Sequence, residues 1–331
     1  MKKSKLLLVL LLLVATVLAA CNSKEENTAS TEGAGPATPE KITFGYVPSA
    51  GILQVLYIIA KDKQLFETEF KEDGIAFEHR NFQSGPVLME ALRGNSLDIG
   101  HVGDQPYIQA VANGAELTAI GLHSIGDKNY GLVVPEGSSV KSSADLKGKK
   151  VAVTLGSIGH RILDLYLTEN GYTMADVEAI NIPPGDIKNT LAAKNVDAAI
   201  IWEPWISTIE QEGIGKQIAT TEGLKRNINP TIATTKFVTK YPEVTQRIIN
   251  VYKDALTWVQ ENPEEAAKIV AKDAGFDETI FANAMKDEEY IVEITEEAIT
   301  SMEDTAKFLL DNGVIRSEVT IRDFIDTSFA K

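Results

Sequence analysis

Apolar runs and helical stretches alternate along the first half of the chain. Residues 42–47, 75–82 and 98–102 are short apolar runs of the kind that forms buried strands, and each is followed by a turn and then by residues with helical spacing. Strand, turn and helix repeated three times predict crossover connections and a largely parallel sheet. The turns then lie at one edge of that sheet, where open α/β sheets bind ligands.

The same pattern starts again near residue 130 and predicts a second sheet. Its expected strands are residues 130–134, 150–154, 177–182 and 197–202. A glycine-containing turn precedes the expected helix at residues 160–169. Two consecutive sheets of this type predict two α/β lobes, which suits a chain of this length.

The C-terminal region has a helical pattern throughout. Ile248, Tyr252 and Val259 recur at helical spacing, and Asp277 and Thr295 have the residue types of helix N-caps. We expect this region to pack against the first lobe. The complete division is a signal segment (1–20), a tether (21–40), lobe 1 (41–125 and 238–331) and lobe 2 (126–237), with hinges near 122–130 and 220–239.

The N-terminus has the three parts of a secretory signal. A basic start precedes an apolar run of about fifteen residues, and small residues lead to Cys21, the only cysteine. A membrane-spanning helix needs about 20 residues, so a retained anchor is the weaker alternative. The segment resembles the bacterial lipobox, in which the chain is cut before the cysteine and the thiol is acylated. Secretion with a free Cys21 thiol is the other alternative. The polar residues 22–40 predict a disordered tether.

Charge limits the partners that the mature chain can bind. Cleavage after residue 20 removes three lysines and no acidic residue, which changes the formal net charge from −15 to −18. This charge disfavours nucleic acid and anionic lipid. It still permits an anionic ligand, because the Debye length is only about 8 Å at physiological salt. A single cysteine excludes an intramolecular disulfide. We expect a monomer without a cofactor.

Several predicted turns place small and hydrogen-bonding residues at helix starts. Free backbone N–H groups and the helix dipole make such positions suitable for an oxyanion. Each turn alone is more often an ordinary helix cap, so the agreement between the two lobes carries the prediction. The residues concerned are Gln83, Ser84, Gly85, Asp104, Gln105, Gly156, Ser157, His160 and Arg161.

A series of motifs in order along residues 41–310 extends this interpretation. It includes FQSGP at 82–86, LDIGHVGD at 97–104, ADLKGKKVAV at 144–153 and DAAIIWEP at 197–204. The series resembles the solute-binding proteins of nitrate, sulfonate and taurine ABC transporters. FQSGP, with the serine and histidine after Gly156, looks closest to the aliphatic-sulfonate branch. The sequence departs from the family pattern at Gln64, where glycine is usual, and at Gln105 and Arg161.

The resemblance implies a two-lobed fold like that of type II periplasmic binding proteins. It implies a ligand cleft between the lobes, hinge closure and delivery to an ABC permease, by a protein lipid-anchored outside the cytoplasm. The implied ligand is a small organic anion such as an alkanesulfonate or taurine. Nitrate, a phosphonate or a thiamine-precursor pyrimidine are the alternatives within the fold. Enzymes with related folds are the alternative of another class, which the absence of a nucleophile motif disfavours.

A sulfonate only accepts hydrogen bonds, so its site needs donors. Ser84, Ser157, backbone amides and Arg161 fit, and His160 is either a further donor or a helix-cap residue. Asp104 and Glu203 do not fit the anion: they cap helices or bond local backbone, or they receive an ammonium group at the far end of a ligand such as taurine.

Aromatic and histidine residues complete the list of candidates. Trp202 and Tyr46, with Trp205, line an apolar wall of the cleft or belong to the core. The remaining histidines lack metal-ligand spacing, and we assign no role to them: His79, His101 and His123.

Overall fold

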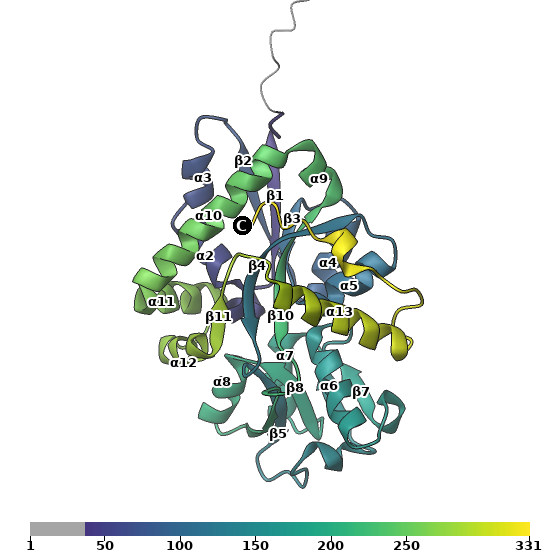
Figure 1. Cartoon of the computed structure of the whole chain (residues 1–331). Helices are drawn as coiled ribbons and strands as arrows, with labels where there is room; N and C mark the ends of the chain where they lie inside the picture. Colours follow the sequence, from purple (N-terminus) through teal and green to yellow (C-terminus); the bar gives the residue numbers. More distant parts are fainter. Residues whose placement is uncertain (1–36) are drawn as a thin grey trace, which may run out of the picture. The chain divides into compact units, whose positions relative to one another are not determined.

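The computed structural model describes residues 37–331. The predicted signal segment, the predicted lipidation at Cys21 and residues 21–36 of the predicted tether lie outside the described residues. Within 37–331, no helix combines the length and the apolar composition needed to cross a membrane. The described chain contains two sheets, one above the other in Figure 1, and this confirms the predicted α/β class with two lobes.

The first sheet has six strands and is mixed rather than purely parallel. Strand β1 pairs in parallel with β2 on one side and with β3 on the other. Strand β10 pairs antiparallel with β3, and β4 pairs antiparallel with β10. The short strand β11 pairs with the outer side of β4. In spatial order the strands are β11 (Glu288–Tyr290), β4 (Leu117–Gly126), β10 (Asn227–Thr234), β3 (Ile99–His101), β1 (Lys41–Tyr46) and β2 (Ala76–Asn81).

The second sheet has five strands, with β6 parallel to β7 and β8, and β5 antiparallel to β8 and β9. In spatial order they are β7 (Glu178–Asn181), β6 (Lys150–Val153), β8 (Ala198–Trp202), β5 (Tyr130–Pro135) and β9 (Gly215–Thr220). Three α-helices accompany this sheet, α6 (Ile158–Glu169), α7 (Pro184–Ala192) and α8 (Trp205–Gln211), together with the short η2 (Ser143–Leu146) and η3 (Met174–Asp176). We call residues 130–220, from the start of β5 to the end of β9, lobe 2, and the rest of the described chain lobe 1.

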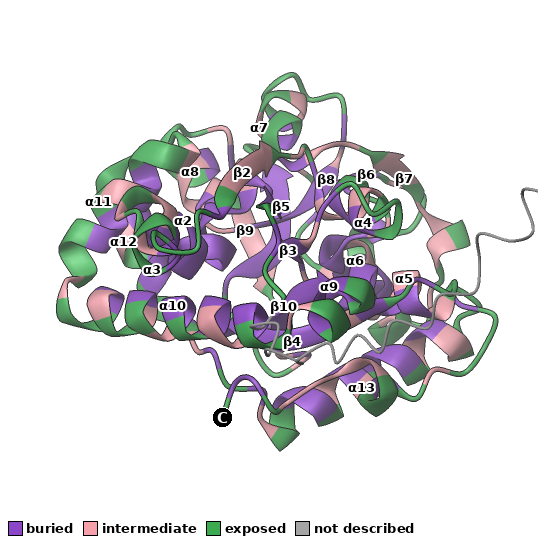
Figure 2. Cartoon of the chain, turned by 90° about the horizontal axis from the view of Figure 1, so that it is seen from above, coloured by how far each residue is buried: buried purple, intermediate pink, exposed green. Residues whose placement is uncertain are grey.

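The C-terminal helices pack on lobe 1, as predicted. The long helix α10 (Pro242–Glu261) lies against α2 (Val55–Asp62), and α13 (Glu296–Asp311) lies against α5 (Asp104–Ala112). In Figure 2 α10 and α13 alternate buried and exposed positions, whereas α2 and strands β4 and β10 are almost wholly buried. The other lobe 1 helices are η1 (Pro48–Gln54), α3 (Leu65–Glu69), α4 (Gly85–Arg93), α9 (Thr235–Lys240), α11 (Pro263–Ala274), α12 (Glu278–Ala284), η4 (Met285–Asp287) and η5 (Ile321–Phe324).

The chain passes between the sheets twice, from β4 to β5 and from β9 back to β10. Strand β10 lies between β3 and β4 in the first sheet, so residues 227–234 belong to lobe 1, although we placed them in lobe 2. Every residue of this strand is buried despite its polar composition. Its polar side chains conceal the apolar signal from which a core strand is usually recognised.

Local capping and turn chemistry follow the sequence closely. The Asp277 carboxylate accepts hydrogen bonds from the backbone N–H groups of Thr279 and Ile280, and Thr295 Oγ1 accepts one from Ala298, which confirms both predicted N-caps. Gln64 has φ 54°, a left-handed conformation that favours glycine. This conformation is consistent with the glycine that the family resemblance implies at that position.

Candidate functional site

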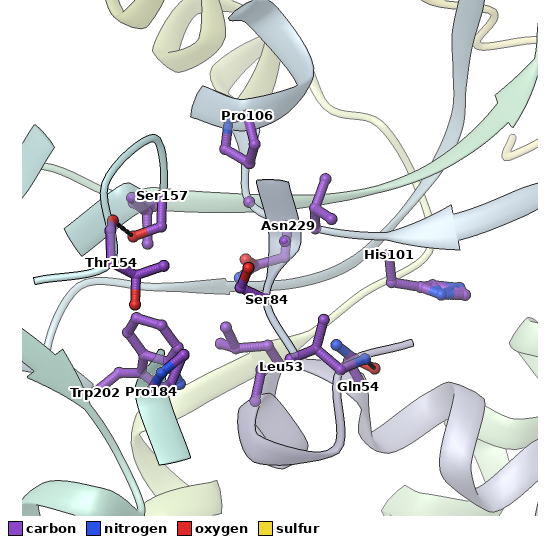
Figure 3. A pocket seen from close by; sticks show the side chains of 16 residues that line it. Leu53, Gln54, Ser84, His101, Pro106, Thr154, Ser157, Pro184, Trp202 and Asn229 are labelled. Atoms are coloured by element: carbon purple, nitrogen blue, oxygen red, sulfur yellow. Dashed lines mark hydrogen bonds between the residues drawn. The ribbon is translucent and has the colours of Figure 1, made fainter. Parts of the chain in front are cut away.

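A cavity of about 50 Å³ lies between residues of the two lobes (Figure 3). In that view Ser157, Thr154 and Trp202 of lobe 2 are on one side, and Ser84, Leu53, Gln54 and Asn229 of lobe 1 are in the centre and below. In this conformation the small volume of the cavity suits a ligand of few heavy atoms.

Four helices begin at this cavity. The N-caps of α4, α5 and α6 are Ser84, Gly103 and Ser157, and all three line it, as does Pro184, the first residue of α7. The N-terminal end of a helix carries a partial positive charge and free N–H groups. Among the lining residues there is no Asp, Glu, Lys or Arg. Helix ends and neutral donors thus provide the favourable environment for an anion.

Ser84 and Trp202, which both line the cavity, retain unused donors. Ser84 is the N-cap of α4, but its side chain makes no capping hydrogen bond. The indole Nε1 of Trp202 is buried and has no hydrogen-bond partner among the described residues. A buried donor without a partner is costly, so a bound acceptor at this position is favourable.

The hydroxyl groups of lobe 2 are engaged in local hydrogen bonds. Ser157 Oγ donates to the Thr154 carbonyl at 2.7 Å and accepts from the Gly159 N–H at 3.1 Å. Thr154 Oγ1 donates to the carbonyl of Ile182 at 2.8 Å. Ser157 therefore caps α6 in this structure, in addition to lining the cavity.

Asn229 on β10 lines the cavity and is held by a buried carboxylate. Its Nδ2 donates to Ser124 Oγ at 3.1 Å and to Glu288 Oε1 at 3.4 Å, and Glu288 Oε2 accepts from Asn129 Nδ2 at 2.6 Å. Burial raises the pKa of Glu288 to about 7. The carboxylate fits because Glu288 pairs with Gly126, where a β-carbon would lie 2.1 Å from Glu288 Oε2.

Asp104 lies beside the cavity in a separate buried cluster. Its Oδ2 accepts from Lys225 Nζ at 2.8 Å and from Thr305 Oγ1 at 2.7 Å. Gly103 is the N-cap of α5, so Asp104 does not cap that helix. Burial lowers the pKa of Lys225, and the charge of Asp104 opposes that effect. The carboxylate is thus neutralised by a lysine from the β9–β10 connection.

Three predicted site residues line a different groove. Gln105, His160 and Arg161 surround a space of about 300 Å³ between α6 and α13. Arg161 Nη1 donates to the Thr305 carbonyl at 3.2 Å, and its guanidinium lies 4.1 Å from the centre of the Phe308 ring. Burial lowers the pKa of His160. None of these three is among the residues that line the cavity.

The other predicted residues take several positions. Gln83 is exposed, and the Tyr46 hydroxyl accepts a hydrogen bond from Lys61 Nζ at 2.9 Å. The Glu203 carboxylate accepts from the backbone N–H and the hydroxyl of Ser207 at 3.1 and 2.9 Å, and burial raises its pKa. Gly156 has φ 79° and would place a β-carbon 3.4 Å from Pro86 of lobe 1.

The structure therefore brings Ser84, Gly85, Ser157 and Trp202 together at the cavity. It adds residues that we did not select, including Gln54, His101 and Asn229. His101 is buried beside His123, with ring centres 3.9 Å apart, and burial lowers its pKa to about 3. Within residues 37–331, no group of three or more His, Cys, Asp or Glu residues is arranged to hold a metal ion.

Comparison with known proteins agrees with this two-lobed arrangement. Residues 35–273 match the NMT1-like family. The chain belongs to that family. This NMT1-like protein is 31% identical to a Bacillus subtilis protein named as an aliphatic sulfonates-binding protein, over 85% of this chain and 86% of the relative. It is 27% identical to the taurine-binding periplasmic protein of Escherichia coli, over 77% of this chain and 84% of the relative.

A solved structure with a similar fold contains a bound ligand. The NMT1-like chain superposes on the alkanesulfonate-binding protein SsuA from Xanthomonas axonopodis pv. citri bound to MOPS, with a TM-score of 0.79 and 25% identity. The superposition covers 88% of this chain and 99% of SsuA. The fold is thus that of a binding protein with two lobes, as the motif series implied.

Proposed function

We propose that this protein is the extracytoplasmic solute-binding component of an ABC importer, and that it captures a small organic sulfonate between its lobes for delivery to a permease. The cavity carries this proposal. Four helix starts and two unused donors face a space without charged side chains, which is suited to a permanently ionised group that only accepts hydrogen bonds. The names of the sulfonate- and taurine-binding relatives support the same ligand class.

The apolar part of the lining favours an organic anion over nitrate. Leu53, Val102, Ile158 and Pro184 contact the cavity together with Trp202. A short alkyl group gains from burial against such residues, whereas nitrate has only oxygen atoms to present. A binding function is also better supported than catalysis, because the lining offers neither a carboxylate nor a cysteine.

The proposed ligand residues are Ser84, Gly85, Ser157 and Trp202, with the free N–H groups of the helix starts. Asp104, Gln105, Glu203, His160 and Arg161 then act outside direct contact with the ligand. Hinge closure would use the β4–β5 and β9–β10 connections. Opening of the lobes at these connections would give a ligand access to the cavity of about 50 Å³.

A thermal-shift experiment tests the ligand class. The panel contains ethanesulfonate, 2-aminoethanesulfonate, nitrate, methylphosphonate and an aminopyrimidine, with ethylammonium as the control of opposite charge. Saturation at a hundred times the dissociation constant adds about 2.7 kcal/mol to the free energy of unfolding, which raises the melting temperature by several degrees. We expect this shift with a sulfonate. A shift with the aminopyrimidine and with no sulfonate would overturn the proposal.

We further propose that Cys21 carries the lipid that anchors the protein to the outer face of the cell membrane. A lipid anchor keeps the cavity near its permease and raises the local concentration. Mass spectrometry of the membrane-extracted protein tests this directly, because a diacylglyceryl-modified Cys21 would be the first residue. A membrane-extracted protein in which Cys21 is unmodified would contradict it.

A further inference from the structure

In the Asn229 side-chain amide, the nitrogen is hydrogen-bonded and the oxygen has no partner among the described residues. Asn229 is 2% exposed, and its Nδ2 is used by Ser124 and Glu288. Its Oδ1 has no hydrogen-bond partner among the described residues. This oxygen lies 3.8 Å from the position of a β-carbon on Gly103, which also lines the cavity. The open acceptor is therefore on the ligand side of the side chain.

Glu288 prevents the amide from turning over. When Glu288 is ionised, above its pKa of about 7, both carboxylate oxygens act as acceptors, one for Asn229 at 3.4 Å and the other for Asn129 at 2.6 Å. A reversed Asn229 amide would place its own oxygen against Glu288 and would lose the hydrogen bond to that carboxylate. An acceptor thus remains at the cavity, where Trp202 Nε1 and the helix starts present donors and His101 Nδ1 is a further buried atom without a partner among the described residues.

A ligand in this cavity cannot avoid Asn229. The space is about 50 Å³, so a ligand of several heavy atoms touches residues on every side. A sulfonate oxygen next to Oδ1 would be repelled, and an alkyl group would leave the acceptor buried without a partner, which is unfavourable. An N–H or O–H group on the ligand satisfies the acceptor.

We propose that Asn229 is a specificity-determining residue, which selects an organic sulfonate that carries an N–H or O–H donor a few atoms from its sulfur. Glu288 is its positioning residue. The proposal rests on the proposed function, because it assumes that the anionic group is a sulfonate. The two ends of the ligand then bind to different groups. Hydrogen-bond donors bind the sulfonate, and the Asn229 acceptor binds the opposite end.

Three ligands of nearly equal size test the proposal by isothermal titration calorimetry. They are ethanesulfonate, 2-hydroxyethanesulfonate and 2-aminoethanesulfonate, which differ only at the end away from the sulfur. We expect at least one donor-bearing ligand to bind the wild-type protein about tenfold or more tightly than ethanesulfonate. In Asn229→Leu protein this preference should disappear. Asn227→Leu is the matched control, because Asn227 is buried two positions earlier on the same strand but does not line the cavity.

The outcomes separate this inference from the function on which it rests. If all three sulfonates bind the wild-type protein equally, the role of Asn229 is wrong and the proposed function stands. If none binds, the proposed function fails as well. Glu288→Gln provides a second variant should Asn229→Leu fail to fold: we expect a reduced preference for the donor-bearing ligand, and an unchanged preference would contradict the positioning role.

Discussion

Arg161 Nη1, on α6 of lobe 2, donates a hydrogen bond to the backbone carbonyl of Thr305, on α13 of lobe 1. The same guanidinium lies over the ring of Phe308, one turn further along α13. Thr305 in turn donates its hydroxyl to Asp104. The two lobes are thus connected by a buried side chain that does not line the cavity.

Replacing Arg161 should weaken ligand binding without changing ligand preference. Arg161→Met removes the hydrogen bond between the lobes and destabilises the closed form, so the affinity for every sulfonate falls by the same factor, about tenfold. Titration calorimetry with two sulfonates measures both quantities. Arg93→Met is the control, since Arg93 is exposed on α4. Unchanged affinity in the Arg161 variant would show that this contact does not stabilise the bound state.

The indole N–H of Trp202 should contribute directly to anion binding. Trp202→Phe keeps an aromatic ring in the cavity wall but removes the unpaired Nε1 donor, and a hydrogen bond to a charged group is worth about 1.5–3 kcal/mol. We expect sulfonate affinity to fall about tenfold or more, with little loss of thermal stability. Trp258→Phe on α10 should leave affinity unchanged. If wild-type and Trp202→Phe protein bound sulfonate with equal affinity, Trp202 Nε1 would not be a ligand-binding group.

The two serines at the cavity should behave differently. Ser84 makes no capping hydrogen bond, so Ser84→Ala should reduce sulfonate affinity and change the free energy of unfolding by less than about 0.5 kcal/mol. Ser157 accepts the Gly159 N–H, so Ser157→Ala should lower the free energy of unfolding by about 1 kcal/mol. Urea unfolding and titration calorimetry on both variants provide the comparison. A loss of stability in Ser84→Ala and a loss of affinity alone in Ser157→Ala would show that Ser84 is the helix cap and Ser157 the ligand-binding residue.

Glu288 should make stability depend on pH in a defined direction. Burial raises its pKa from 4.5 to about 7; the neighbouring Asp127 and Glu289 also raise it, and hydrogen bonds from Ser124 and Asn129 oppose the shift. The folded protein therefore holds this proton more tightly than the unfolded chain. The resulting stability is present below pH 4.5 and is lost as the pH rises to about 7, a change of roughly 3 kcal/mol.

The variant Glu288→Gln removes the titrating carboxyl group and so isolates its contribution to the pH dependence of stability. Between about pH 5 and pH 8, the free energy of unfolding should fall by roughly 2–3 kcal/mol more in the wild-type protein than in the variant. Taking the difference cancels the buried histidines, which are present in both proteins. Parallel pH profiles would mean that Glu288 titrates near its ordinary pKa in the folded state.

The sequence predicted the features that depend on local chemistry. Ser84 and Ser157 were found because a small polar residue before an apolar helix is a local signal, and parallel strands bring such turns to one edge of a sheet. Arg161 follows the same turn as Ser157, but its direction is decided by contact with Phe308, which is far away in sequence. No local pattern contains that information.

Strand β10 shows the same limit for the fold. Asn227, Asn229 and Thr231 are buried, although these residue types are usually exposed. Their burial depends on pairing with β3 and β4 on either side. The sequence therefore placed this segment in the wrong lobe, and it gave no reason to select Asn229 for the site.

A crystal structure with 2-aminoethanesulfonate tests the central claim most directly. We predict that the sulfonate group occupies the cavity between the lobes, with oxygen atoms at hydrogen-bonding distance from Ser84 Oγ, Trp202 Nε1 or the N–H groups at the starts of α4 and α6. A ligand bound instead in the groove beside Arg161 and His160, or a cavity without ligand at saturating concentration, would contradict the account.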